Sequence, residues 1–297
     1  MTEPQPDVAS GITYWTSQPA SYDGVLGGYG TGTLPRVDSL GSRLFLLNIL
    51  PELSTILPAI TIPTLPSSTD RRSYKALEVG AGVGRVTSDV LLYHFHTVYM
   101  IEPVEPFINT AIANARSGKW ASLTEGKTVH FIQATLQNFD LSKPLASVGE
   151  EAVEEGVKFD VAWCQWCLGH LSTPDLIVFF KRLATLSPLI VVKENVCSDS
   201  PEGEPREVYD AEDSSLTRSD EAWKKAFKDA GLTLFKEEVQ EGLPEGLYVV
   251  KRCVYVDIQR TDFMLTRNTV TLFNLECALV SGPPLQPHVR LRSAQTV

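Results

Sequence analysis

Short apolar runs alternate with segments of helical apolar spacing through the middle of this 297-residue chain. A short apolar run between turn residues predicts a buried strand, and apolar residues three or four positions apart predict a helix. This alternation is typical of a doubly wound α/β sheet with parallel strands and crossover helices. The strands predicted here are residues 74–79, 97–102, 129–133, 159–164 and 189–195.

Two further apolar runs follow at residues 233–240 and 248–255. The stretch EGLPEG between them is too short for a crossover helix, so this last pair is predicted to be antiparallel. The predicted fold class is therefore α/β, with a seven-stranded, mostly parallel sheet that ends in an antiparallel hairpin. The acidic stretch SVGEEAVEEGVK is predicted to be a solvated helix or loop.

The residues before the sheet form an N-terminal extension. Residues 1–10 are predicted to be disordered and 14–30 to be a loop, whereas the spacing in RVDSLGSRLFLLNILPEL predicts a helix that ends near Pro51. The Pro-, Ser- and Thr-rich link TIPTLPSSTDRRS follows. We therefore divide the chain into an extension (1–66), a cofactor-binding domain (67–257) and a tail (258–297). The tail is predicted to be a peripheral strand or helix followed by disorder, and catalysis should not need it.

Composition narrows the class of protein and its partners. Apolar residues make up 43% of the chain, enough for the core of one large domain. The 26 basic and 36 acidic residues give a net charge of −10, which disfavours a nucleic-acid partner and suits a basic one. Five cysteines at irregular spacing, and a polar start without a signal-peptide pattern, indicate the cytoplasm or the nucleus. No apolar run is long enough to span a membrane, so we expect no membrane association.

A cluster of glycines, LEVGAGVGR, stands where the first predicted strand gives way to a helix. Gly80 and Gly82 allow a tight turn and a close approach of the backbone to a ligand at a helix N-terminus. Glu102, at the end of the second predicted strand, can accept hydrogen bonds from ribose hydroxyls. These residues together predict an adenosine-type cofactor.

The glycine cluster leaves two classes of cofactor open. Nicotinamide dehydrogenases bind pyrophosphate on G-x-G-x-x-G, whereas the spacing here is G-x-G-x-G, preceded directly by Glu78. A carboxylate repels pyrophosphate but suits the cationic amino group of S-adenosylmethionine, so the motif favours methyl transfer over hydride transfer. The predicted antiparallel hairpin points the same way, and a purely structural turn is the third interpretation.

The stretch DVAWCQWCLGHLS follows the fourth predicted strand. Because ligands of open α/β sheets bind beyond the carboxyl ends of the strands, Gln165, Trp166 and His170 are placed to meet a substrate. Cys164 and Cys167 form a C-x-x-C pattern, but only Cys197 is a plausible further zinc ligand. We interpret the pair as half-buried residues at a strand end, and we predict no metal.

Six stretches taken together resemble one family in their order and approximate spacing. They are YWTSQPASYDGVLGGYG, LEVGAGVGRVT, QWCLGHL, VVKENV, DAEDSSLTRS and AGLTLFKEEVQEGLPEGLY. Over about residues 12–250 the chain is similar to the protein alpha-N-terminal methyltransferases, which are class I S-adenosylmethionine-dependent enzymes. Those enzymes methylate the exposed α-amine of proteins whose processed N-terminus reads Xaa-Pro-Lys.

The resemblance implies a role for individual residues. His170 and Asp213 match the residues proposed to accept the amine proton. The implied cofactor contacts, together with the glycine loop, are Gly80, Gly82, Arg85, Glu102, Leu136, Gln137 and Gln165. The implied peptide pocket is Trp15, Leu26, Gly27, Trp166, Asn195, Asp210, Ser215 and Tyr248. The chain departs from the family in its glutamates at positions 78 and 102, where aspartate is frequent, and in Pro103.

The resemblance also interprets the upstream glycines of DGVLGGYG as a lid over the peptide substrate rather than a second cofactor loop. It implies S-adenosylmethionine as cofactor, S-adenosylhomocysteine as product, and Xaa-Pro-Lys N-termini, for example of ribosomal proteins, as substrates of a monomeric enzyme. A protonated amine has no lone pair, so Asp213 and His170 are expected to take its proton, while Asp210 and Ser215 receive the third-position lysine. The alternatives are a small-molecule methyltransferase, a nicotinamide-dependent reductase, a binding module without turnover and, for Asp213, a helix cap.

Overall fold

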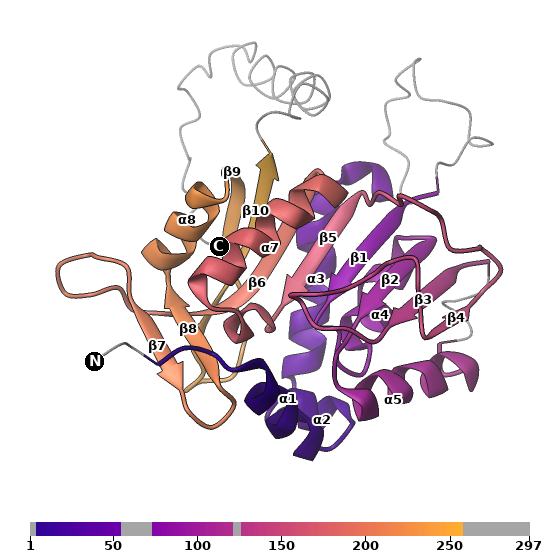
Figure 1. Ribbon diagram of the computed structural model, residues 1–297, viewed down its shortest axis with the longest axis horizontal. Helices are drawn as coiled ribbons and strands as arrows, with labels where there is room; N and C mark the ends of the chain where they lie inside the picture. Colours follow the sequence, from indigo (N-terminus) through magenta and orange to yellow (C-terminus); the bar gives the residue numbers. More distant parts are fainter. Residues whose placement is uncertain (1–3, 55–72, 121–125, 258–297) are drawn as a thin grey trace, which may run out of the picture. The chain divides into compact units, whose positions relative to one another are not determined.

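The computed structural model describes residues 4–54, 73–120 and 126–257 of the chain (Figure 1). The predicted tail and most of the Pro-rich link lie outside these residues. The division of the chain into three parts therefore stays a prediction.

A single mixed sheet of ten strands forms the centre of the described residues. The strands are β1 (Lys75–Val79), β2 (Thr97–Ile101), β3 (Thr128–Ile132), β4 (Ala146–Val148), β5 (Val161–Gln165), β6 (Leu189–Cys197), β7 (Glu207–Asp210), β8 (Ser215–Ser219), β9 (Leu232–Val239) and β10 (Val249–Asp257). Eight of them lie side by side in the order β4-β3-β2-β1-β5-β6-β10-β9, and β8 joins β6 and β7.

The predicted seven-strand pattern is present within this sheet. Strands β3, β2, β1, β5 and β6 are parallel to one another, whereas β10 is antiparallel to both β6 and β9 at one end of the sheet and β4 is antiparallel to β3 at the other. Strands β4, β7 and β8 were not predicted, because none of them is a continuous apolar run. The largest buried side chain of β8 is that of Arg218, which donates to the carbonyls of Leu168 and Leu171 and pairs with Glu207.

Helices cover both faces of the sheet (Figure 1). They are α1 (Val8–Ser17), α2 (Tyr22–Val25), α3 (Leu34–Ile49), α4 (Arg85–Asp89), α5 (Glu105–Arg116), α7 (Thr173–Leu186) and α8 (Asp220–Asp229), with 3₁₀ turns η1 (Pro51–Leu53), η2 (Leu91–Tyr93) and η3 (Leu168–His170). Among these described helices, none is long and apolar enough to cross a membrane.

Alternate residues of the central strands face the two helical layers. Cys164 and Val192 belong to the main apolar core with residues of α7 and α8. Gln165 and Lys193, one position further along β5 and β6, point to the opposite face and contact Asp38 of α3. The helix predicted in the N-terminal extension is therefore confirmed, and it packs directly on the sheet.

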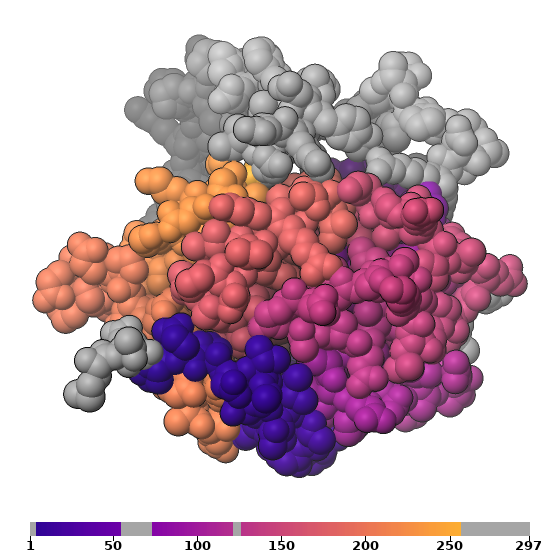
Figure 2. Space-filling model, in the orientation of Figure 1, coloured from indigo at the N-terminus to yellow at the C-terminus, as the bar shows by residue number. Residues whose placement is uncertain are grey.

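The start of the chain is more ordered than predicted. Residues 8–10 begin helix α1 instead of being disordered, and α1 and α2 occupy residues 14–17 and 22–25 of the predicted loop. The carboxylate of Asp7 accepts a hydrogen bond from the Ser10 N–H at 2.7 Å, while the Asp7 N–H donates to the Ser214 hydroxyl at 2.8 Å. Figure 2 shows this indigo segment lying against the orange β7–β8 hairpin. The helix was missed because a contact with a distant turn holds it, while only Gly11 within it is buried.

The two cysteines of the C-x-x-C pattern are more buried than predicted. Cys164 and Cys167 are free and buried, and burial raises the pKa of both thiols well above the usual value. No cluster of metal-ligating side chains occurs within the described ranges. Both cysteine side chains belong to the main apolar core, so they are buried rather than half-buried as predicted.

Candidate functional site

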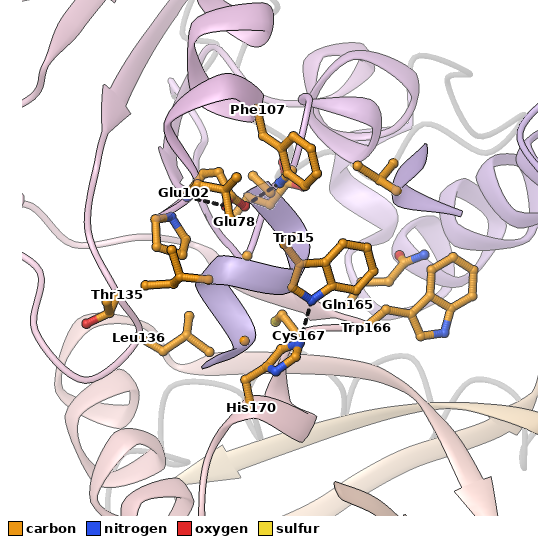
Figure 3. Close-up of a pocket in the computed structure, with 18 of the residues that line it drawn as sticks. Trp15, Glu78, Glu102, Phe107, Thr135, Leu136, Gln165, Trp166, Cys167 and His170 are labelled. Atoms are coloured by element: carbon orange, nitrogen blue, oxygen red, sulfur yellow. Dashed lines mark hydrogen bonds between the residues drawn. The ribbon is translucent and has the colours of Figure 1, made fainter. Parts of the chain in front are cut away.

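A pocket opens at the carboxyl ends of β1, β2 and β5, where the sequence predicted a cofactor (Figure 3). Its glycine loop needs glycine for steric reasons. Gly80 has a φ of +63°, and a Cβ there would lie 2.2 Å from the Cβ of Cys167. All of the predicted cofactor contacts line this pocket: Gly80, Gly82, Arg85, Glu102, Leu136, Gln137 and Gln165.

Glu102 holds the glycine loop to the next strand. Its carboxylate accepts hydrogen bonds from the N–H of Gly82 at 2.7 Å and of Val104 at 2.8 Å. Burial raises the pKa of Glu102 to about 7, although these two hydrogen bonds oppose the rise. The carboxylate keeps free lone pairs, so it can still accept from ribose hydroxyls. Pro103, one of the departures from the family, also lines the pocket.

Glu78 is a second buried carboxyl group in the same pocket. It accepts a hydrogen bond from the hydroxyl of Thr87, and burial raises its pKa to about 8. A cation bound beside Glu78 would favour its ionised form and lower this pKa. The group therefore suits a ligand with a positively charged amine.

A second hollow adjoins the first and matches the predicted peptide pocket. The predicted substrate residues that line it are Trp15, Leu26, Gly27, Trp166, Asn195, Ser215 and Tyr248, and the two predicted proton acceptors, His170 and Asp213, line it as well. Asp210 is different, because it is exposed and does not line the hollow. It stands opposite Ser215 in the β7–β8 register, and its carboxylate accepts from the Glu212 N–H at 2.8 Å.

Trp15, Leu26, Trp166 and His170 line both hollows, so the two sites meet at these residues. The indole N–H of Trp15 donates to Nε2 of His170 at 2.9 Å (Figure 3). In the neutral imidazole the hydrogen therefore resides on Nδ1, and burial lowers the pKa of His170 despite the charge of Asp213. His170 can accept a proton at Nε2 only when Trp15 releases that nitrogen.

Asp213 lies in the turn between β7 and β8, before Ser214, whose φ is +56°. Its Oδ1 is buried and makes no hydrogen bond to any described residue. The alternative in which Asp213 caps a helix is wrong, because the Ser219 hydroxyl caps α8 by accepting from the Ala222 N–H. Since no described residue occupies it, Oδ1 of Asp213 is free to accept a hydrogen bond or a proton from a bound ligand.

The glycine-rich segment that was predicted to be a lid lies where the two hollows meet. Val25 and Leu26 line both hollows, and Gly27 lines the peptide side. Gly27 and Gly28 have φ values of +58° and +88°, which side chains rarely adopt. The glycines thus let this segment turn over the junction of the two sites.

Sequence reasoning missed two buried acids: Glu194, which lines the second hollow, and Asp38, which lies behind the first. Glu194 accepts hydrogen bonds from the N–H groups of Cys167 and Leu168, both at 2.9 Å, and so fixes the loop that carries Trp166 and His170. Asp38 contacts the two cofactor-pocket residues Arg85 and Gln165 from behind. The sequence did carry a signal that Asp38 is buried: it lies four residues after the buried Leu34, on the apolar face of α3.

Comparison with known proteins places this geometry in one family. The model of a family described as AdoMet dependent proline di-methyltransferase matches residues 5–256. The chain is 36% identical to an alpha N-terminal protein methyltransferase 1 of Arabidopsis thaliana, covering 81% of this chain and 76% of that protein. It is 33% identical to an N-terminal Xaa-Pro-Lys N-methyltransferase 1-A of Xenopus laevis, covering 80% and 89%. The solved structure of a SAM-dependent methyltransferase from Leishmania major is 30% identical, with a TM-score of 0.60 over 83% of this chain and 82% of that one.

Proposed function

This chain belongs to the family of AdoMet-dependent proline di-methyltransferases, and we propose that it methylates the free α-amine of proteins whose N-terminus reads Xaa-Pro-Lys after removal of the initiator methionine. S-Adenosylmethionine is the cofactor of this family, and S-adenosylhomocysteine is the product that remains after transfer. The observation that carries the proposal is the junction of the two hollows at Trp15, Trp166 and His170. A methyl donor in one hollow and an amine in the other would meet there.

The donor set of the first hollow fits S-adenosylmethionine. Glu102 would hold the ribose hydroxyls, Glu78 the amino group, and Arg85 with Gln165 the carboxylate. Leu136 and Gln137 complete the lining. When bound, the cofactor supplies a methyl group on a positively charged sulfur.

The residues at the junction would prepare the amine for attack. An unperturbed α-amine has a pKa of about 7.7 to 8.0, so most of it is protonated at neutral pH and must lose a proton. Asp213 would accept this proton first, since its Oδ1 has no other partner within the described part of the chain. His170 would share the proton once Trp15 releases Nε2. Alignment of the amine by the walls of the pocket would supply much of the remaining rate.

Acidic residues of the β7–β8 turn, of which Asp213 lines the peptide pocket, favour a basic substrate. Burial raises the pKa of Tyr14, and the negative charges of Glu212, Asp213 and Asp210 raise it further. The same charges would attract the lysine at the third position of the substrate, with Asp210 and Ser215 as its partners.

We also propose that the enzyme acts as a monomer in the cytoplasm or the nucleus on proteins such as ribosomal proteins. Free buried cysteines suit a reducing compartment, and a net charge of −10 suits basic N-termini.

The proposal is tested by comparing a Ser-Pro-Lys peptide, the same peptide with an acetylated N-terminus, and a panel of small amines, with S-adenosylhomocysteine formation as the readout. We expect turnover of the free peptide alone. Turnover of small amines without turnover of the peptide would instead establish a small-molecule methyltransferase. Equal turnover of the acetylated peptide would move the reaction away from the α-amine.

A further inference from the structure

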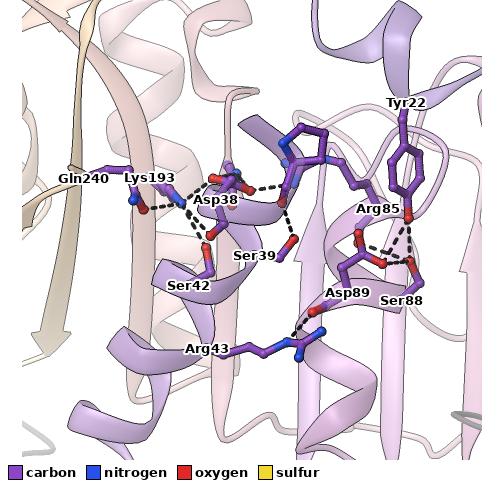
Figure 4. Close-up of polar contacts among 12 residues, drawn as sticks. Tyr22, Asp38, Ser39, Ser42, Arg43, Arg85, Ser88, Asp89, Lys193 and Gln240 are labelled. Carbon is purple, nitrogen blue, oxygen red and sulfur yellow. Dashed lines mark hydrogen bonds and ion pairs between the residues drawn. The ribbon is translucent and has the colours of Figure 1, made fainter. Parts of the chain in front are cut away.

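Asp38 joins the N-terminal extension to the cofactor pocket (Figure 4). Its side chain is fully buried, although it lies on helix α3, outside the alternating strands and helices of the domain. Its Oδ2 accepts from Nη1 of Arg85 at 2.5 Å, and Nε2 of Gln165 lies 3.0 Å from both carboxylate oxygens. Nζ of Lys193 donates to the Oδ1 atom. One carboxylate thus contacts α4, β5 and β6 at once.

The buried cluster carries an excess of positive charge. Burial alone would raise the pKa of Asp38, but the charges of Arg85 and Lys193 outweigh it and hold the pKa below its usual value. The ionised Asp38 therefore faces two cations, and the three groups together carry a net charge of +1. Burial raises the pKa of Glu78 to about 8, which disfavours the ionised form that would balance this charge.

The excess charge is presented by Arg85 rather than by Lys193. The three hydrogens of the Lys193 ammonium group have acceptors in Asp38, Ser42 and Gln240. Arg85 donates one N–H to Asp38 and lines the cofactor pocket, with its guanidinium 5.4 Å from the centre of the Trp166 ring. Its remaining N–H groups can meet the carboxylate of the cofactor.

The orientation of the Gln165 amide depends on Asp38 too. The Oε1 atom of Gln165 accepts from the indole N–H of Trp163 at 3.1 Å, and its Nε2 donates to Asp38. Both ends of the amide are thereby fixed. The remaining hydrogen of Nε2 is the donor that this amide can still offer to a ligand.

We propose that Asp38 is a positioning residue of the cofactor site: it orients the guanidinium of Arg85 and the amide of Gln165 for the carboxylate of the cofactor. The N-terminal extension therefore contributes to cofactor binding as well as to the peptide lid. This role is independent of which amine receives the methyl group, because it is read from cofactor binding and not from turnover.

The test is the affinity for S-adenosylhomocysteine, measured by titration calorimetry on the full chain. The variant Asp38→Asn alone leaves Lys193 buried without its counter-ion and is expected to be unstable. The double variant Asp38→Asn with Lys193→Met removes both charges, so the cluster keeps its net charge of +1 on Arg85. We expect the double variant to fold and to bind roughly 10- to 100-fold more weakly, the factor that the loss of one hydrogen bond to a charged group produces.

The matched control is Ser42→Ala, which removes a partner of Lys193 at 2.9 Å and leaves Arg85 and Gln165 untouched. It should lower the melting temperature and leave the affinity unchanged. If the double variant binds within twofold of the unaltered protein, Asp38 only neutralises Lys193, and the proposal is overturned.

A measurement on the unaltered protein covers the case in which the double variant does not fold. Addition of S-adenosylhomocysteine should slow hydrogen exchange of amides in α3 more than in β9, because the ligand completes the cluster that includes Asp38. Unchanged exchange in α3, with slower exchange in the glycine loop, would contradict the proposal.

Discussion

Asp213→Asn is expected to slow methyl transfer strongly without disturbing the fold. The amide has nearly the shape of the carboxylate, and Oδ1 of Asp213 has no hydrogen bond to lose within the described residues. Helix α8 keeps its own cap at Ser219. The residue is also absent from the lining of the cofactor pocket. We therefore expect a melting temperature and an affinity for S-adenosylhomocysteine close to those of the unaltered protein.

The size of the effect follows from the role of the carboxylate as a base. Removal of a general base ordinarily costs about 10² to 10⁴ in rate. For an α-amine with a pKa of about 7.7 to 8.0, the neutral fraction rises from roughly 0.1–0.2 at pH 7 to more than about 0.9 at pH 9. Because solvent deprotonates most of the amine at pH 9, the rate of the Asp213→Asn variant should be about five- to tenfold higher at pH 9 than at pH 7.

The assay is single-turnover transfer to a Ser-Pro-Lys peptide at pH 7 and pH 9, which separates the chemical step from product release. His170→Gln serves as the companion variant and should lose less activity, since Trp15 already occupies Nε2 of His170. Near-normal turnover of Asp213→Asn at pH 7 would remove Asp213 from the mechanism and leave His170 or solvent as the proton acceptor.

Three further outcomes follow from the site. Trp15→Phe removes the indole N–H that favours neutral His170, so the pKa of His170 should rise. The measurement is an NMR titration of the imidazole protons, and an unchanged pKa would contradict the hydrogen bond between Trp15 and His170. Burial raises the pKa of Glu102 from 4.5 to about 7, so in the folded protein without cofactor this carboxyl group stays protonated to a higher pH than in the unfolded chain. Its stability should therefore fall as the pH rises from about 5 to 7, and thermal melts of Glu102→Gln should show a weaker fall. Because Asp210 is exposed, Asp210→Asn should reduce the preference for Ser-Pro-Lys over Ser-Pro-Glu peptides by only about two- to fivefold in kcat/KM, and an unchanged ratio would exclude Asp210 from lysine recognition.

The parallel strands β1, β2, β3, β5 and β6 were predictable because each carries a local apolar run. The strand β1, Lys75–Val79, is one example, and the glycine loop after it needs only local geometry to be identified. The hairpin β7–β8 was not predictable in this way. The buried side chain of Arg218 is stabilised by carbonyl groups far away in the sequence, which no local pattern reveals.

The same distinction applies to the candidate site. Residues at strand ends, such as Gln165, were identified from their place in the sheet and from the family motif. The partners that orient them come from remote segments: Asp38 meets Gln165 from the N-terminal extension, and Trp15 meets His170 from helix α1. Such pairings depend on how α1 and α3 pack on the sheet, which helical spacing alone does not determine.

The central claim is that the methyl group moves from S-adenosylmethionine to an N-terminal α-nitrogen. It is tested most directly by incubating the protein with a Ser-Pro-Lys peptide and S-adenosylmethionine that carries a deuterated methyl group, followed by fragmentation in a mass spectrometer. We predict the label on fragments that contain only the first residue. A label on the lysine side chain, or an unlabelled peptide, would contradict the account.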